Sequence, residues 1–183
     1  ADSDAARSSL FLLAGVTLMD KVSDSEGAIS ALRSVLLVEP KEREAFVRLR
    51  QLYLANGADE ALAQLLSMRL EAGSEDDSEA SELPLSLARV LRGSNDSEAL
   101  LHYRALLARR PSDREAVSAV AEICWAQEKW ADAAEALMIL ARIESEKTEL
   151  ISIFTKLGTI YAEHLPEPRW ALKSFHRVVG LEP

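Results

Sequence analysis

The chain has 183 residues, of which 48% are hydrophobic, 28% are charged and only 5% are aromatic, and its formal net charge is -9. Abundant Ala, Leu, Glu and Arg favour helices over sheets, so we predict an all-α fold. An acidic chain repels phosphate backbones, which argues against nucleic acid as a ligand. The single cysteine, Cys124, excludes an intramolecular disulfide.

The apolar stretch at residues 10–19 (LFLLAGVTLM) is the only segment that resembles a targeting signal. It lacks the usual basic leader and a cleavage site, and it is too short to span a bilayer. We therefore expect a buried helix of a first repeat, no membrane partner and, by default, a cytoplasmic location. The absence of an initial methionine and the closing Pro183 suggest a fragment of a longer protein.

Apolar residues recur at helical spacing along the whole chain, and Ser, Asp, Asn, Gly and Pro punctuate the segments between them. Asp24, Asn56-Gly57 and Gly93-Ser94-Asn95 are expected helix caps or breakers. The pattern predicts ten helices, at about 5–21, 24–38, 42–56, 58–72, 80–92, 96–109, 113–127, 129–144, 149–163 and 167–181.

The even-numbered helices share an alanine that is followed by bulky apolar residues four and seven positions later. The five sets are Ala28, Leu32, Val35; Ala61, Leu65, Met68; Ala99, Tyr103, Leu106; Ala133, Leu137, Leu140; and Ala171, Phe175, Val178. The odd-numbered helices carry a second stripe with a small residue inside it, which lets a neighbouring backbone come close. Those residues are Gly15, Ala88, Ala121 and Gly158, whereas Arg50 breaks the rule in the second unit.

At these residues the chain resembles the tetratricopeptide repeat (TPR) family, whose unit is a helical hairpin of about 34 residues. The fifth unit fits best, with Leu157-Gly158, Tyr161, Trp170-Ala171, Phe175 and Pro183. The resemblance implies an all-α, right-handed α-solenoid of about five repeats, at 5–40, 41–73, 79–111, 112–146 and 148–183 of one array over 1–183. The acidic run at 73–82 (GSEDDSEASE) is the expected flexible joint.

Few residues could carry chemistry. The histidines, His102, His164 and His176, have no partners at metal-ligand spacing, and Cys124 falls on a buried stripe where it would be inert. The sequence has no phosphate-binding loop and no HExxH motif. We therefore expect no enzyme activity, no cofactor and no metal.

In proteins of this family the first helices line a concave face, so specificity should lie in the residues next to each buried stripe. At the N-terminal end these are Leu12, Val16 and Met19. The candidate partner-binding residues are Val47, Gln51, Leu54, Leu85, Arg89, Arg92, Ser118, Glu122, Trp125, Thr155 and Thr159. Trp125 could dominate binding or simply pack on the adjacent helix. Trp130 is expected to wedge between repeats and Trp170 to lie on the outer surface.

The sequence thus predicts a non-catalytic scaffold that binds a peptide or helix of a partner protein in its concave groove. One alternative is a structural spacer, or a module that forms homo-oligomers through its uncapped ends. Another is a regulatory domain of an enzyme that lies outside this fragment.

Overall fold

The computed structural model describes residues 2–19, 24–73 and 77–181, and over these residues the chain forms ten α-helices and no strand. It divides into two compact units, Ala1–Arg92 and Gly93–Pro183. The division falls in the turn of the third predicted hairpin, whose two helices therefore belong to different units. The single array and its joint at 73–82 stay predictions, and residues 74–76 of that joint lie outside the described part.

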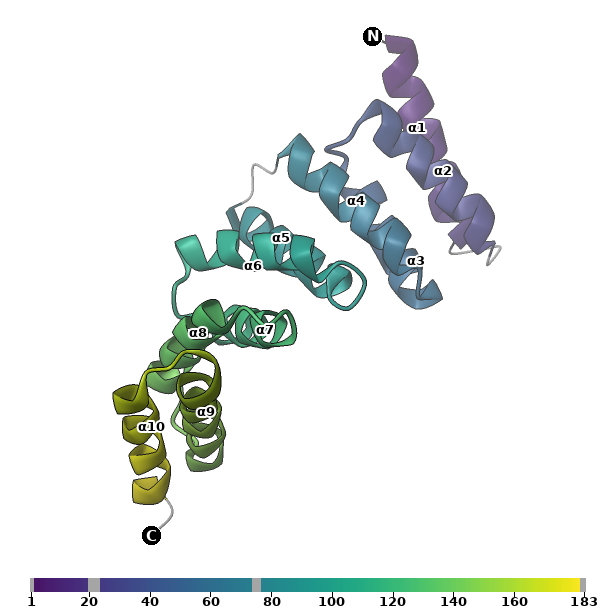
Figure 1. Ribbon diagram of the computed structural model, residues 1–183. Helices are drawn as coiled ribbons and strands as arrows, with labels where there is room; N and C mark the ends of the chain where they lie inside the picture. Colours follow the sequence, from purple (N-terminus) through teal and green to yellow (C-terminus); the bar gives the residue numbers. More distant parts are fainter. Residues whose placement is uncertain (1, 20–23, 74–76, 182–183) are drawn as a thin grey trace. The chain divides into compact units, whose positions relative to one another are not determined.

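The first unit contains five helices, and each packs against the next along the chain (Figure 1). They are α1 (Asp2–Thr17), α2 (Ser25–Val38), α3 (Arg43–Asn56), α4 (Asp59–Ala72) and α5 (Asp77–Leu91). The helix predicted at 80–92 begins three residues earlier, and Pro84 lies inside it. The helix predicted at 5–21 is α-helical to Thr17 and π-helical at residues 18 and 19, and its predicted end at residue 21 lies outside the described part.

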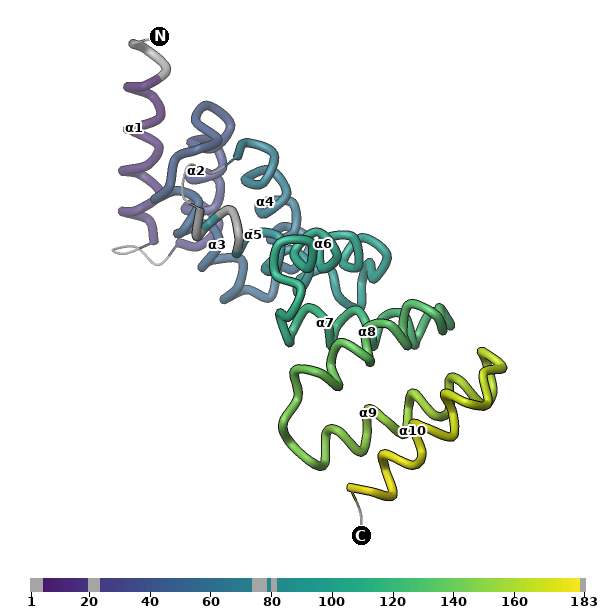
Figure 2. The backbone as a smooth tube through the Cα atoms, turned by 90° about the vertical axis from the view of Figure 1, so that its left-hand side faces the viewer, coloured from purple at the N-terminus to yellow at the C-terminus, as the bar shows by residue number. Residues whose placement is uncertain are grey.

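The second unit repeats the arrangement, and its helices again pack in chain order (Figure 2). They are α6 (Asp96–Arg109), α7 (Arg114–Ala126), α8 (Trp130–Ile143), α9 (Lys147–Thr159) and α10 (Pro168–Leu181). The helix predicted at 149–163 does not stay regular to its end. A π-helical turn, η2 (Ile160–His164), follows α9, and Leu165 N donates to Ile160 O at 2.8 Å.

Short polar side chains fix where the helices begin. Asp24 accepts a hydrogen bond from Gly27 N at 3.0 Å, and Asn95 accepts one from Glu98 N at 3.3 Å, so both predicted caps are confirmed. Gly57 ends α3 with φ at +62°, a left-handed conformation that favours glycine. These local signals explain why most helix boundaries follow from the sequence.

The alanine sets of α2, α6 and α8 form the cores of their hairpins, as predicted. All nine of their residues are buried, and Tyr103 and Leu32 are among the largest fully buried side chains. The small residues of the odd-numbered helices are confirmed too. Gly15 lies so close to Leu32 that a Cβ there would come within 2.8 Å of Cγ. The close approach of α1 and α2 therefore depends on this glycine.

In α4 the buried stripe differs from the prediction by about one residue. Ala61 and Met68 are only partly buried, while Leu62, Leu66 and Arg69 are buried. The guanidinium of Arg69 explains the rotation, because it makes several contacts in the interior of the first unit. Its Nε and Nη2 donate to both carboxylate oxygens of Glu79 at 2.9 and 3.0 Å.

Two further contacts complete the environment of Arg69. Its Nη1 donates to the carbonyl of Pro40 at 3.4 Å, and its Cζ lies 5.1 Å from the centre of the Phe46 ring. Arg69 thus connects α4 with α3, with α5 and with the turn after α2. The apolar spacing did not indicate this residue, because a charged side chain beside an apolar stripe is ordinarily exposed.

The fifth set is buried only in part. Ala171 is buried, but Phe175 is 40% exposed and Val178 is half-buried. Phe175 packs on α9, where a Cβ added at Gly158 would come within 2.5 Å of its Cε1. Among the described helices α10 packs mainly on α9 and η2, and Leu172 and Val179 on its other side are exposed.

Candidate functional site

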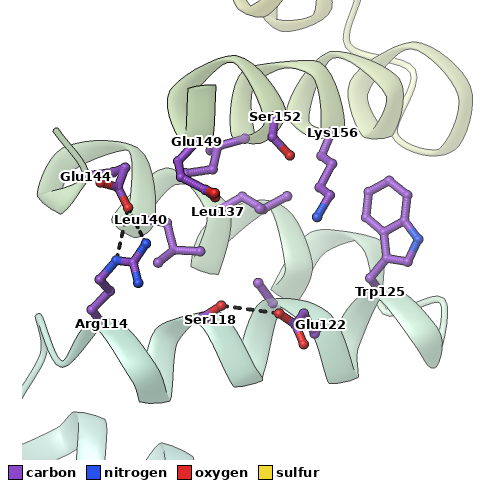
Figure 3. Close-up of a pocket in the computed structure, with 12 residues that line it drawn as sticks. Arg114, Ser118, Glu122, Trp125, Leu137, Leu140, Glu144, Glu149, Ser152 and Lys156 are labelled. Carbon is purple, nitrogen blue, oxygen red and sulfur yellow. Dashed lines mark hydrogen bonds and ion pairs between the residues drawn. The ribbon is translucent and has the colours of Figure 1, made fainter. Parts of the chain in front are cut away.

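A groove of about 230 Å³ lies in the second unit, between α7 and α9, with α8 beneath it (Figure 3). Its lining residues are Arg114, Ser118, Ala121, Glu122, Trp125, Leu137, Leu140, Glu144, Glu149, Ser152, Ile153 and Lys156. The helical spacing of apolar residues buries one side of each helix, and the residues beside that buried side on α7 and α9 face one another across the groove.

The groove has an apolar floor and polar rims. Leu137 and Leu140 of α8 form the floor, and the residues on the two rims come from different helices (Figure 3). On the α7 rim, the Ser118 hydroxyl donates to Glu122 Oε1 at 3.3 Å. Ser152 and Lys156 are exposed on the α9 rim. Such a surface can bury an apolar side chain while its rims bond to polar groups beside it.

One end of the groove is closed by an ion pair between Arg114 and Glu144. Both Nε and Nη2 of Arg114 donate to Glu144 Oε2, at 3.0 and 2.6 Å. The other oxygen of Glu144 accepts from the backbone N–H groups of Ser145 and Glu146, at 2.9 and 3.0 Å. The amide of Glu146, and then Arg114 and the amide of Ser145, lower the pKa of Glu144 to about 2.

Aromatic rings form the other end. Trp125 meets Trp130 edge to face, with ring centres 5.3 Å apart, and Trp130 stacks on His164 at 3.7 Å. Trp130 therefore connects α8 with the turn after α9, which agrees with its predicted place between repeats. The π-helical turn brings His164 to this position, and nothing in the apolar spacing indicated that turn. Trp125 is half-buried, so part of its ring faces the groove.

In the second unit, three predicted site residues line this groove: Ser118, Glu122 and Trp125. Thr155 and Thr159 do not, and their hydroxyls donate to the carbonyls of Ile151 and Thr155. The groove is lined by one side of α7 and by the opposite side of α9, the next odd-numbered helix. The prediction from the sequence assumed that every odd-numbered helix presents the same side to a ligand, and therefore it did not include Ser152 and Lys156. Choosing the α9 residues that directly precede its buried residues would have included both.

The first unit also has a groove between two successive odd-numbered helices, and this groove is smaller. Val47 lines a groove of about 160 Å³ between α3 and α5. The other lining residues are Arg43, Phe46, Arg50, Glu79, Glu82, Leu83 and Ser86. The remaining predicted residues there, Gln51, Leu54, Leu85, Arg89 and Arg92, lie outside this groove, and all but the half-buried Leu85 are exposed. A role in binding remains a prediction for all of them.

Groups with chemical reactivity are sparse in the described part of the chain. Cys124 is buried, and burial raises the pKa of its thiol, which disfavours the reactive thiolate. Within residues 2–19, 24–73 and 77–181, no cluster of three or more His, Cys, Asp or Glu side chains could hold a metal ion. None of the helices described there has the length and apolarity that crossing a membrane requires.

No protein-family model and no curated protein matches this chain. Several solved structures are similar to it. A MamA structure has 19% sequence identity and a TM-score of 0.61, over 97% of this chain and 93% of that one. The MamA 41-end structure from Desulfovibrio magneticus RS-1 has 16% identity and a TM-score of 0.56, over 96% and 95% of the two chains.

A third similar structure is YrrB, described as a TPR protein with an unusual peptide-binding site. It has 17% identity and a TM-score of 0.59, over 94% of this chain and 85% of that one. At identities this low, the likeness establishes the fold alone. It confirms the fold that the repeat pattern predicts. The chain has the all-α helical repeat fold of the tetratricopeptide repeat proteins.

Proposed function

We propose that this protein is a non-catalytic interaction scaffold, and that the groove between α7 and α9 binds a peptide segment of a partner protein. The observation that carries the proposal is the combination of an apolar floor, two polar rims and a half-buried tryptophan in one groove. No histidine or cysteine is among its lining residues as the structure describes them, so it offers neither an imidazole base nor a thiol nucleophile.

The size of the groove favours a peptide side chain over a whole small molecule. Sites for small ligands usually enclose about 300–1,000 Å³. This groove has about 230 Å³ and is open to solvent along its rims. A cavity of about 150 Å³ holds one benzene ring, so there is room here for one or two apolar side chains.

Trp125 is suited to contribute most of the binding free energy. Its edge-to-face contact with Trp130 orients the ring before a partner arrives, which reduces the entropy lost on binding. Tryptophan is enriched among the residues whose truncation weakens protein interfaces most. Ser152, Lys156 and Glu122 on the rims would bond to the polar groups of a bound segment. The structural similarity to YrrB, a peptide-binding protein by its description, supports the same reading.

The proposal can be tested with peptides selected from a random display library on the unmodified protein. Binding of the selected synthetic peptides would then be measured by fluorescence anisotropy. We expect Trp125→Ala to weaken binding about 30-fold, the equivalent of ~2 kcal/mol. Ser152→Trp, which fills the groove, should abolish it.

A matched pair of charge changes on α9 serves as the control. Lys156 lines the groove, whereas Lys147 is exposed in the first turn of the same helix. Lys156→Glu should change the affinity and Lys147→Glu should not. If Trp125→Ala and Ser152→Trp both bind the selected peptides as the unmodified protein does, this groove is not the peptide site.

Self-association is a second candidate function, and the uncovered side of α10 favours it. Leu172, Phe175 and Val179 are 61%, 40% and 67% exposed and follow one another at helical spacing. Sedimentation velocity over a wide concentration range tests this directly. We expect a dimer that Leu172→Glu dissociates, whereas a monomer at every concentration rules the candidate out.

A further inference from the structure

A second groove, of about 270 Å³, lies between α8 and α10 with α9 beneath it. It shares no residue with the groove between α7 and α9, because α8 and α9 present different sides to the two. Its lining residues are Met138, Ala141, Arg142, Phe154, Leu157, Tyr161, Trp170, Lys173, Ser174 and Arg177.

The interior of this second groove is aromatic and apolar. The rings of Tyr161 and Trp170 are 6.3 Å apart and inclined at 32°, and the Tyr161 hydroxyl lies 3.7 Å from the Met138 sulfur. Burial, with a further contribution from Glu167, raises the pKa of the Tyr161 hydroxyl, so it stays neutral. Trp170 is 48% exposed and offers a face for an apolar side chain.

The charged residues that line this groove are all basic, and Glu167 lies outside its lining. Arg142, Lys173 and Arg177 line the groove, and neither aspartate nor glutamate is among its described lining residues. This contrasts with a net charge of -9 for the chain as a whole. The Lys173 ammonium lies 4.8 Å from the centre of the Trp170 ring. No ion pair involves these three cations within the described part of the chain, so their charge is available to a ligand.

We propose that the groove between α8 and α10 is a second docking site, which binds an acidic linear segment of a partner protein. An apolar side chain of that segment packs against the rings of Tyr161 and Trp170. Carboxylates on either side of it bond to Lys173, Arg142 and Arg177. Opposite charges across an interface raise association rates and exclude wrong partners.

The site is small, and this distinguishes a peptide from a nucleic acid. Non-specific binding to nucleic acid requires many phosphate contacts along an extended basic surface. Here three cations surround one apolar groove, and the rest of the protein is acidic. That arrangement fits one anchoring side chain with a few flanking carboxylates.

The test uses the full chain carrying Trp125→Ala, so that the first groove contributes little. A random peptide display library is selected on this variant, and the recovered sequences are compared with the input library. We expect enrichment of Asp and Glu next to one aromatic or aliphatic residue. Recovery of sequences without acidic enrichment would overturn the proposal.

Synthetic versions of the selected peptides then identify the residues involved. Arg142→Glu combined with Arg177→Glu should weaken binding at least about tenfold, as should Trp170→Ala. Arg169→Glu is the matched control, because Arg169 is exposed on the same helix but does not line the groove. Its affinity should stay within about twofold of the parent.

Two further outcomes contradict the proposal. One is unchanged binding when the acidic residues of the peptide are replaced by glutamine, since the cations would then be irrelevant. The other is unchanged binding by the Arg142→Glu, Arg177→Glu variant. Either result leaves the proposal for the first groove intact, because that one is judged by Trp125 and Ser152.

Discussion

The two units share one recurring pattern of small and bulky residues, but they stabilise their helices differently. In the first, a buried guanidinium, that of Arg69, contacts three other segments. The described core of the second contains no buried guanidinium: the arginines of the pairs Arg104–Asp132 and Arg114–Glu144 are exposed, although the Glu144 side chain is only 7% exposed. Apolar spacing therefore predicts where a core lies, but not that every position in it is apolar.

Arg69→Ala should have the largest effect on this contrast. It removes a partner of Glu79 and the cation above Phe46, and we expect a loss of about 3 kcal/mol in the free energy of unfolding. Urea denaturation followed by circular dichroism measures it. Arg69→Met, which keeps the volume without the charge, should lose less.

Arg33→Ala provides the control, because Arg33 is exposed on α2 and its loss should cost under about 0.5 kcal/mol. If Arg69→Ala is no more destabilising than this control, the buried guanidinium does not hold the first unit together. The two units would then be alike in depending on their apolar contacts.

The sequence predicts a feature well when that feature depends on residues that are close together in the chain. Tyr103 and Leu137 were predicted correctly, because a buried stripe is a property of one helix and its spacing. Ser152 and Lys156 were not, because the flank that faces a neighbour depends on how two helices pack. Arg69 was missed because its partners lie far away in the sequence.

The α9–α10 contact gives the second prediction, which concerns the apolar packing of the second unit. Gly158→Ala places a Cβ about 2.5 Å from Phe175 Cε1, so the Phe175 ring or the helices must shift. Overpacking typically costs about 1–3 kcal/mol, and the higher helix propensity of alanine offsets about 1 kcal/mol of it. We expect a net loss of about 1 kcal/mol by thermal or urea unfolding, partly restored by Phe175→Leu.

Gly180→Ala is the control for that substitution. Gly180 lies on α10, and nothing is within 4 Å of a Cβ added there. The alanine should therefore be neutral or slightly stabilising. Equal effects of the two substitutions would show that the packing between α9 and α10 is loose, contrary to the structure.

The smallest expected effect is a pH dependence at the α8–α9 corner, where the second unit uses polar contacts at its surface. Folding lowers the pKa of Glu144 from its ordinary 4.5 to about 2, through the amide of Glu146 first and then Arg114. A lowered pKa stabilises the folded state above pH 4.5, and that contribution is lost as the pH falls towards 2. Glu144→Gln cannot ionise, so its melting temperature should decline less steeply than that of the unmodified protein across this interval.

The amide of Glu146 lowers the pKa of Glu144 more than Arg114 does, and the amide of Ser145 lowers it less. This order separates two explanations of the corner. Arg114→Gln should retain much of the pH dependence, since the N–H groups of Ser145 and Glu146 still bond to the carboxylate. Glu135→Gln, an exposed change on α8, controls for the loss of one negative charge. If Arg114→Gln removes the dependence as completely as Glu144→Gln does, the ion pair holds the corner, and the second unit then depends on a guanidinium as the first one does.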